Sequence, residues 1–289
     1  MSAPGVSCRT PARGTALSDS TPGHAPGPAS GPASDPASGP ILPGGMTEDG
    51  FLGGRIRIRQ PAGGYRAAID PVFLAASIPV RSGERVLEAG AGHGTAAICL
   101  ASRVPDCQVF GIEAQPDLVR LANENARLNG LGASVQVMVG DLVKPLPRLP
   151  AGGFDHAMAN PPYLQADAAD ASPEAGRAAA NVEGEAVLAD WIRFLVRMVK
   201  PKGTITLVHR ADRLDEILAL LRGEAGGIIV YPLWPKAGVP AKRVIVRARR
   251  GIRTPLVVAP GLVLHGDGGA YTPEADAVLR GGALDVAGA

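Results

Sequence analysis

From Thr47 onward, short apolar runs rich in β-branched residues alternate with longer amphipathic stretches. The apolar runs predict strands at residues 85–88, 108–113, 135–139, 154–159, 204–208, 228–231 and 243–248. The amphipathic stretches predict helices at residues 95–102, 116–129, 190–200 and 212–222. Such alternation is typical of a mostly parallel sheet with helices packed on its faces, so the sequence predicts an α/β fold.

The first 45 residues differ in composition, because Pro, Ala, Ser and Gly dominate and a Pro-Ala-Ser unit recurs between residues 28 and 38. Such a segment has little to bury and cannot offset the entropy of ordering it. We therefore predict a disordered tail at residues 1–45 and a single domain at residues 46–289. Arg9 and Arg13 leave a targeting peptide open, but Asp19, Asp35 and the proline content favour an inert extension.

The composition of the 289-residue chain, with 46% hydrophobic and 19% charged residues, is that of an ordinary soluble protein. No apolar run is long enough for a membrane helix, so we expect a cytoplasmic protein without a membrane partner. The three cysteines show no Cys-x-x-Cys spacing, which predicts neither a disulfide framework nor a metal site. The net charge of +2 does not by itself indicate nucleic acid.

A glycine-rich turn joins the first predicted strand to its helix, in the order Glu88, Ala89, Gly90, Ala91, Gly92, His93, Gly94. Glycines allow a tight reversal and let a ligand lie on the backbone, and the following helix offers free N–H groups to an anion. A dinucleotide fingerprint would need glycine where Thr95 stands. A ligand-free turn therefore remains an alternative for this motif alone.

Acidic residues close the next two predicted strands. Glu113 could accept hydrogen bonds from both hydroxyls of a ribose, and Asp141 could accept one from an adenine amino group. Each acid alone could be a solvated strand end. Together with the glycine turn, they predict an adenosine-bearing ligand at the carboxyl ends of the strands.

The fourth predicted strand runs directly into Asn160, Pro161, Pro162 and Tyr163. Two prolines cannot continue a central strand, so the chain must leave the sheet at the edge that carries the glycine turn. An ordinary Pro-Pro turn is the alternative interpretation.

The chemistry of these four residues suits a planar amino group. Its lone pair is delocalised, and the Asn160 Oδ1 and Pro161 carbonyl could accept its two hydrogens while Tyr163 stacks on the ring. His156 precedes the motif inside a strand, and we assign it no catalytic role.

These motifs, in this order, resemble the class I, Rossmann-like methyltransferases that act on amino nitrogens. The resemblance implies S-adenosylmethionine as the methyl donor and a seven-stranded sheet with a terminal antiparallel strand. From about Asp49 onward, the chain is more narrowly similar to the bacterial tRNA adenine-N6 methyltransferases that act on valine tRNA, through residues 60–66, 69–71, 190–191 and 271–274. This likeness makes Tyr65 and Asp70 candidate lid residues over the cofactor.

Basic residues favour a nucleic-acid substrate, since no acidic residue lies between Lys236 and Arg253. The candidate RNA-binding residues in this stretch are Lys242, Arg243, Arg247, Arg249 and Arg250. A second set, Arg55, Arg57 and Arg59, would share one face of a strand, with Ile56 and Ile58 on the other. A solvated basic edge strand is the alternative. The predicted partner is tRNA with a looped-out base.

Other substrates share the same tetrapeptide. They are a guanine amino group in rRNA, adenine in DNA and a glutamine amide in a release factor, of which the protein substrate fits less well because no helical substrate domain precedes the glycine turn. A non-catalytic RNA-binding module is an alternative of a different class, against which the intact Asn160 and Glu113 argue.

Overall fold

The structure is a computed structural model, and it describes residues 41–42, 45–63, 66–144, 146–147, 149–163 and 186–288. Most of the predicted tail and the candidate lid residue Tyr65 lie outside the described residues. Within the described part of the chain, no helix is long and apolar enough to cross a membrane.

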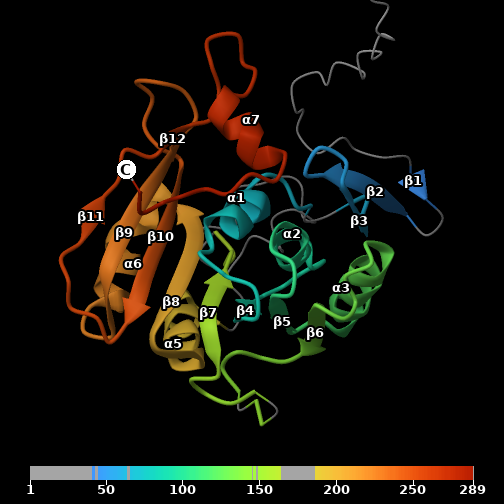
Figure 1. Cartoon of the computed structure of the whole chain (residues 1–289), viewed down its shortest axis with the longest axis horizontal. Helices are drawn as coiled ribbons and strands as arrows, with labels where there is room; N and C mark the ends of the chain where they lie inside the picture. Colours follow the sequence, from blue (N-terminus) through green and yellow to red (C-terminus); the bar gives the residue numbers. More distant parts are fainter. Residues whose placement is uncertain are drawn as a thin grey trace, which may run out of the picture. The chain divides into compact units, whose positions relative to one another are not determined.

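A nine-stranded sheet forms the centre of the described structure (Figure 1). Its path is β11-β9-β10-β8-β7-β4-β5-β6, and β12 pairs with β9. The strands are β4 (Arg85–Ala89), β5 (Gln108–Glu113), β6 (Val135–Val139), β7 (Phe154–Ala159), β8 (Val199–Arg210), β9 (Ala225–Trp234), β10 (Arg243–Arg250), β11 (Val257–Val258) and β12 (Leu262–Val263).

The predicted seven-stranded arrangement is present within this sheet. Strands β4 to β8 pair in parallel, and β10 lies antiparallel between β8 and β9. The two-residue strands β11 and β12 extend the outer side of β9. The α/β fold with a late antiparallel strand is therefore confirmed.

Helices cover both faces of the sheet (Figure 1). They are α1 (Asp70–Ser77), α2 (Thr95–Arg103), α3 (Pro116–Leu128), α5 (Leu188–Met198), the 3-10 turn η2 (Ala211–Arg213), α6 (Leu214–Leu221) and α7 (Pro273–Leu279). Residues of α1, α2, α3 and α7 share one buried cluster, and residues of α5 and α6 share another. Val86 and Leu87 fall into different clusters because neighbouring strand residues face opposite sides.

The register of the parallel strands aligns the predicted site residues. Ala89 lies opposite Ile112 of β5 and Ala159 of β7. The next residue of each strand, Gly90, Glu113 and Asn160, therefore follows at the same level. Strand order and register together bring the glycine turn, the acid and the catalytic motif to one edge of the sheet.

A three-stranded antiparallel sheet precedes this domain, made of β1 (Ile41–Leu42), β2 (Met46–Phe51) and β3 (Ile56–Pro61). The sequence had predicted only one short basic strand here. Its predicted alternation is confirmed, since Ile56 and Ile58 are buried while Arg57 and Arg59 are exposed.

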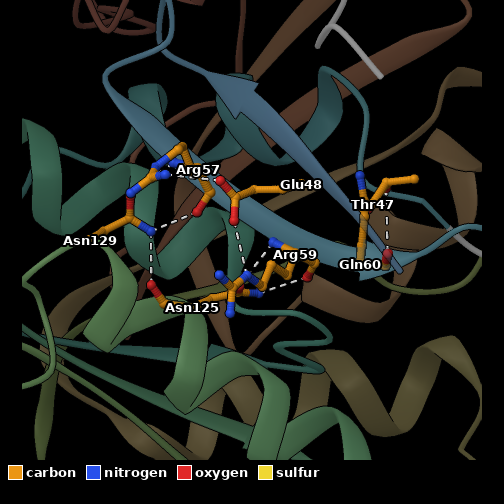
Figure 2. A network of polar contacts seen from close by, with 7 residues as sticks. All are labelled: Thr47, Glu48, Arg57, Arg59, Gln60, Asn125 and Asn129. Atoms are coloured by element: carbon orange, nitrogen blue, oxygen red, sulfur yellow. Dashed lines mark hydrogen bonds and ion pairs between the residues drawn. The ribbon is translucent and has the colours of Figure 1, made fainter. Parts of the chain in front are cut away.

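Two asparagines of α3 dock this small sheet onto the domain (Figure 2). Asn129 accepts from the Arg57 backbone N–H at 2.8 Å and donates to its carbonyl at 2.7 Å. Asn125 makes the same pair of bonds with Arg59, both at 2.9 Å. The rise of one helical turn is close to the length of two strand residues, so the two side-chain amides are spaced to pair with β3 as a neighbouring strand would. Asn125 also donates to the His93 carbonyl at 3.0 Å, which ties β3 to the glycine turn.

The buried carboxylate of Asp49 organises the other side of β3. It accepts from Gln60 Nε2 at 2.5 Å, Thr47 Oγ1 at 3.0 Å and Arg66 Nη2 at 2.7 Å. Gln60 in turn accepts from the Ala67 N–H at 2.8 Å. A fully buried charge requires such partners, and here they hold the chain where it leaves β3 toward α1.

We predict that Asn125→Ala lowers the free energy of unfolding by about 2–3 kcal/mol, because removal of this buried amide leaves the N–H and carbonyl of Arg59 and the His93 carbonyl without their partners. Urea denaturation would measure the loss. Glu124→Ala, at the exposed neighbouring position, is the control. Equal small losses in both variants would contradict the docking role.

Candidate active site

The glycine turn between β4 and α2 is held in a conformation that other residues rarely adopt. Gly90, Gly92 and Gly94 have φ values of +66°, +53° and +81°. At Gly90 an added Cβ would also lie 2.4 Å from Cη2 of Trp191 in α5. Glycine at position 90 is therefore needed for both backbone geometry and packing.

Glu88, in the strand β4 that precedes this turn, supports the start of α2. Its buried Oε2 accepts a hydrogen bond from the Ala97 N–H in the first turns of α2 at 3.0 Å. Burial raises the pKa of Glu88 to about 8, the Ala97 bond opposes that rise and nearby Glu113 adds to it. A carboxyl group that stays largely protonated at neutral pH acts here as a brace for α2.

Glu113 is fixed against the glycine turn at the end of β5. Its Oε2 accepts from the Gly92 N–H and its Oε1 from the Gln115 N–H, each at 3.0 Å. Each carboxylate oxygen has a further lone pair with which to accept another donor. Asp141 follows β6 and accepts from the Val143 N–H at 3.0 Å and from Lys144 Nζ at 2.8 Å. The Lys144 contact and the Val143 bond lower the pKa of Asp141.

The tetrapeptide Asn160–Tyr163, which the sequence predicts to be catalytic, contacts residues from two distant segments. The Tyr163 hydroxyl lies 2.7 Å from Asn160 Oδ1 and 2.6 Å from Asp70 Oδ2, at the start of α1. Arg243, the first residue of β10, donates from Nε to the same Asp70 oxygen at 3.1 Å. Its Cζ lies 4.3 Å from the centre of the Tyr163 ring. The sequence predicts that Asp70 covers the cofactor and that Arg243 binds RNA; in the structure, both side chains contact Tyr163.

His209 is a site residue that the sequence analysis did not identify. Leu207 of β8 lies opposite Ala159, and β8 continues to Arg210, so His209 lies beside the tetrapeptide. Its ring centre is 5.4 Å from that of Tyr163, in an edge-to-face contact. Burial and nearby Arg213 lower the pKa of His209 to about 4, although the Pro162 carbonyl acts in the opposite direction. Its position at the carboxyl end of the predicted strand 204–208 was the signal that could have revealed it.

The basic residues of β10 do not form one surface. Arg243 lies opposite Arg210, at the edge of the sheet where the tetrapeptide lies, which we call the catalytic edge. Arg249 lies opposite Thr204, near the other end of the strand. Six residues of strand span about 20 Å. Arg249 and Arg250 bind the Lys202 and Val199 carbonyls there.

Arg247, in the middle of β10, is only 9% exposed. Its guanidinium is therefore poorly placed to meet a phosphate backbone. Exposed Lys242 lies beside Arg243 at the catalytic edge.

The basic residues of the small sheet are partly neutralised. Arg57 and Arg59 both pair with Glu48, at 3.0 and 2.9 Å, and their side chains remain 58% and 44% exposed (Figure 2). Arg55 donates to the carbonyls of Leu52 and Arg280. The predicted basic ridge is thus present on one face of the small sheet, and the acidic residue Glu48 pairs with two of its arginines.

A family described as a methyltransferase domain matches residues 80–220, which run from before β4 to within α6. The match covers the glycine turn, Glu113 and the catalytic tetrapeptide. The chain is an S-adenosylmethionine-dependent methyltransferase with a Rossmann-like fold.

A solved structure with a TM-score of 0.64 supports the fold of the methyltransferase. It is a predicted O-methyltransferase, protein Atu636 from Agrobacterium tumefaciens, with 25% identity over 75% of this chain and 98% of that one.

Two curated relatives are methyltransferases by name. A tRNA1(Val) (adenine(37)-N6)-methyltransferase from Aeromonas hydrophila is 29% identical over 72% of this chain and 85% of its own length. A release factor glutamine methyltransferase from Rhodospirillum rubrum is 31% identical over 60% of this chain and 53% of its own length. The methyltransferase uses S-adenosylmethionine to methylate a nitrogen atom.

We predict that Glu88→Gln changes how stability depends on pH. The pKa of Glu88 rises from 4.5 to about 8 on folding, so the folded state holds this proton more tightly and wild-type stability falls as pH rises from 4.5 to about 8. The amide does not titrate. The free energy of unfolding of the variant, relative to that of the wild type, should therefore rise by at least about 1 kcal/mol between pH 5 and pH 8.

Denaturant unfolding of both proteins at the two pH values would measure this difference. Because it is taken between variant and wild type, the titration of His209 and other groups cancels. The exposed Glu124→Gln is the control and should show no such change. A constant difference between Glu88→Gln and the wild type would contradict the assignment of a protonated Glu88.

Proposed function

We propose that the methyltransferase methylates N6 of an adenosine in tRNA. The observation that carries this proposal is the alignment of Asn160 with Gly90 and Glu113 across β7, β4 and β5, which faces the amino-binding motif toward the cofactor turn. The tRNA adenine-N6 methyltransferase from Aeromonas hydrophila supports the choice of base and RNA.

The residues at the turn fit S-adenosylmethionine. The positive φ values of Gly90 and Gly92 expose backbone on which the cofactor could lie, and Glu113 would accept from its ribose hydroxyls. The buried Thr95 Oγ1, at the start of α2, has no hydrogen-bond partner among the described residues. The cofactor carboxylate would be stabilised there by the free N–H groups of the helix. Asp141 would accept from the adenine amino group.

The target amino group requires acceptors rather than a strong base. Because conjugation delocalises its lone pair, the Asn160 Oδ1 and Pro161 carbonyl would accept its hydrogens and draw the nitrogen toward tetrahedral geometry. S-adenosylmethionine supplies an electrophilic methyl group on its sulfonium. Arg243 lies over the Tyr163 ring, and the ring would stack on the target base and fix its orientation.

The proposal is tested with labelled S-adenosylmethionine and total RNA from a strain that lacks the gene, followed by nucleoside mass spectrometry. Label in N6-methyladenosine supports it. Label in N2-methylguanosine, or none in RNA, contradicts it. Purified release factor is included as a second acceptor, because the Rhodospirillum rubrum relative is named for a glutamine substrate.

We predict that Asn160→Ala lowers the rate of methyl transfer by about 10²–10³-fold, because an oriented acceptor for the reacting group is lost. Cofactor affinity, measured by calorimetry, should change little. Glu113→Ala is the matched variant and should weaken cofactor binding, since its carboxylate would hold the ribose. A large loss of cofactor affinity in Asn160→Ala would show that the roles of these two residues are misassigned.

The exposed basic residues nearest the catalytic edge lie in and around the connection from β9 to β10, residues 235–242. Lys236 and Lys242 are exposed, and the connection contains no acidic residue. The antiparallel pairing of β10 with β8 places this connection at the end of β8 where Arg210 lies, beside the tetrapeptide. We therefore assign the phosphate contacts nearest the target base to these lysines.

We predict that replacing Lys236 and Lys242 together by alanine weakens RNA binding and reduces the slope of log affinity against log salt by about 1–2. Fluorescence anisotropy at several salt concentrations would measure both. The matched control is Arg249→Ala, at the opposite edge of the sheet. An equal loss in the control would indicate that RNA does not approach from the catalytic edge.

A further inference from the structure

The Tyr163 hydroxyl has two acceptors but only one proton. Asp70 Oδ2 lies 2.6 Å from the hydroxyl oxygen and Asn160 Oδ1 lies 2.7 Å from it. At any moment the hydroxyl can donate to one of them. The acceptor that receives the proton determines the state of Asn160.

The choice matters because Asn160 Oδ1 is the acceptor assigned to the target amino group. A hydroxyl proton directed at that oxygen would occupy one of its two lone pairs and make it a weaker acceptor for the amino hydrogen. A hydroxyl that donates to Asp70 instead removes this competition. Methyl transfer on an amine therefore favours the second arrangement.

Charge favours Asp70 as the acceptor. Hydrogen bonds to a carboxylate are shorter and stronger than those to a neutral amide, and 2.6 Å lies in the range of the charged type. Arg243 Nε, 3.1 Å from the same Oδ2 atom, keeps the carboxylate in place and stabilises its charge. The Asp70 side chain is only 17% exposed, so water screens this interaction little.

Packing keeps the Tyr163 ring between its neighbours. The Arg243 guanidinium lies over one ring face at 4.3 Å, and the fully buried His209 meets the ring edge-to-face at 5.4 Å. A ring confined in this way keeps its hydroxyl between the two acceptors. The direction of the proton is then set by the charge on Asp70.

We propose that Asp70, fixed by Arg243, is a positioning residue that draws the Tyr163 hydroxyl proton away from Asn160 Oδ1 and so keeps that oxygen a stronger acceptor for the target amino group. The inference rests on the proposed role of Asn160. It differs from the expectation that Asp70 covers the cofactor, because it predicts an effect on turnover that depends on the Tyr163 hydroxyl.

A double-mutant cycle tests the proposal. Asp70→Asn keeps the size of the side chain but removes its charge, so the hydroxyl should turn more often to Asn160. We expect kcat to fall about 10-fold, the scale of one hydrogen bond, with cofactor affinity within about 2-fold of the wild type. In the Tyr163→Phe background there is no hydroxyl to redirect, and Asp70→Asn should change kcat by less than about 2-fold.

Two further variants sharpen the test. Arg243→Gln releases the Asp70 carboxylate and should also lower kcat only when the Tyr163 hydroxyl is present. Asp212→Asn removes an acid at the same edge that pairs with Arg210 rather than with Tyr163 or Arg243, and it should have little effect in either background. Denaturant unfolding of each variant reports on folding separately from turnover.

The outcomes separate this inference from the proposed function. Equal loss of kcat from Asp70→Asn with and without the Tyr163 hydroxyl would overturn the inference, because Asp70 would then act through structure alone. A loss of cofactor affinity of about 10-fold or more would also overturn it, in favour of a lid role. Absence of N6-methyladenosine with the wild type would contradict the proposed function and this inference together.

Discussion

Backbone pairing of β4 with β5 on one side and β7 on the other is the constraint on which the site depends. Ala89 faces Ile112 and Ala159 in this ladder, so the three chains leave the sheet at one level. A shift of one residue in either pairing would turn the side chains of that strand to the opposite face of the sheet. The apolar clusters on the two faces resist such a shift, since each needs alternate residues of these strands.

The small N-terminal sheet is joined to the same edge through polar contacts. Asn125 bonds both to β3 and to the His93 carbonyl in the glycine turn, so one buried side chain links the two. Asp49 holds Arg66 on the opposite side of β3. Because these groups are buried, loss of any partner would leave an unsatisfied donor, acceptor or charge. The position of the segment that leads to α1 and Asp70 is thereby coupled to the cofactor turn.

The sequence predicted the elements whose signals are local. The strands 108–113, 135–139 and 154–159 have the predicted bounds because each is a short apolar run ended by turn residues or an acid. The antiparallel sheet of β1 to β3 was missed, since β2 (Met46–Phe51) contains Thr, Glu, Asp and Gly and has little apolar character. Its buried Asp49 looks like a surface residue until Gln60 and Arg66 are seen around it.

The surroundings of Tyr163 could not be predicted for a topological reason. Helices α2 and α3 and strands β4 to β7 lie between α1, which begins at Asp70, and the tetrapeptide, while α5, β8, η2, α6 and β9 are the described elements between the tetrapeptide and Arg243. Only the insertion of β10 between β8 and β9 brings the start of β10 to the carboxyl end of β8. Seen along the chain, Arg243 belongs to a basic run that favours RNA, although that run includes buried Arg247 as well as exposed Lys242 and Arg249. In the folded protein, the charge of Arg243 instead stabilises Asp70, which accepts a hydrogen bond from the Tyr163 hydroxyl.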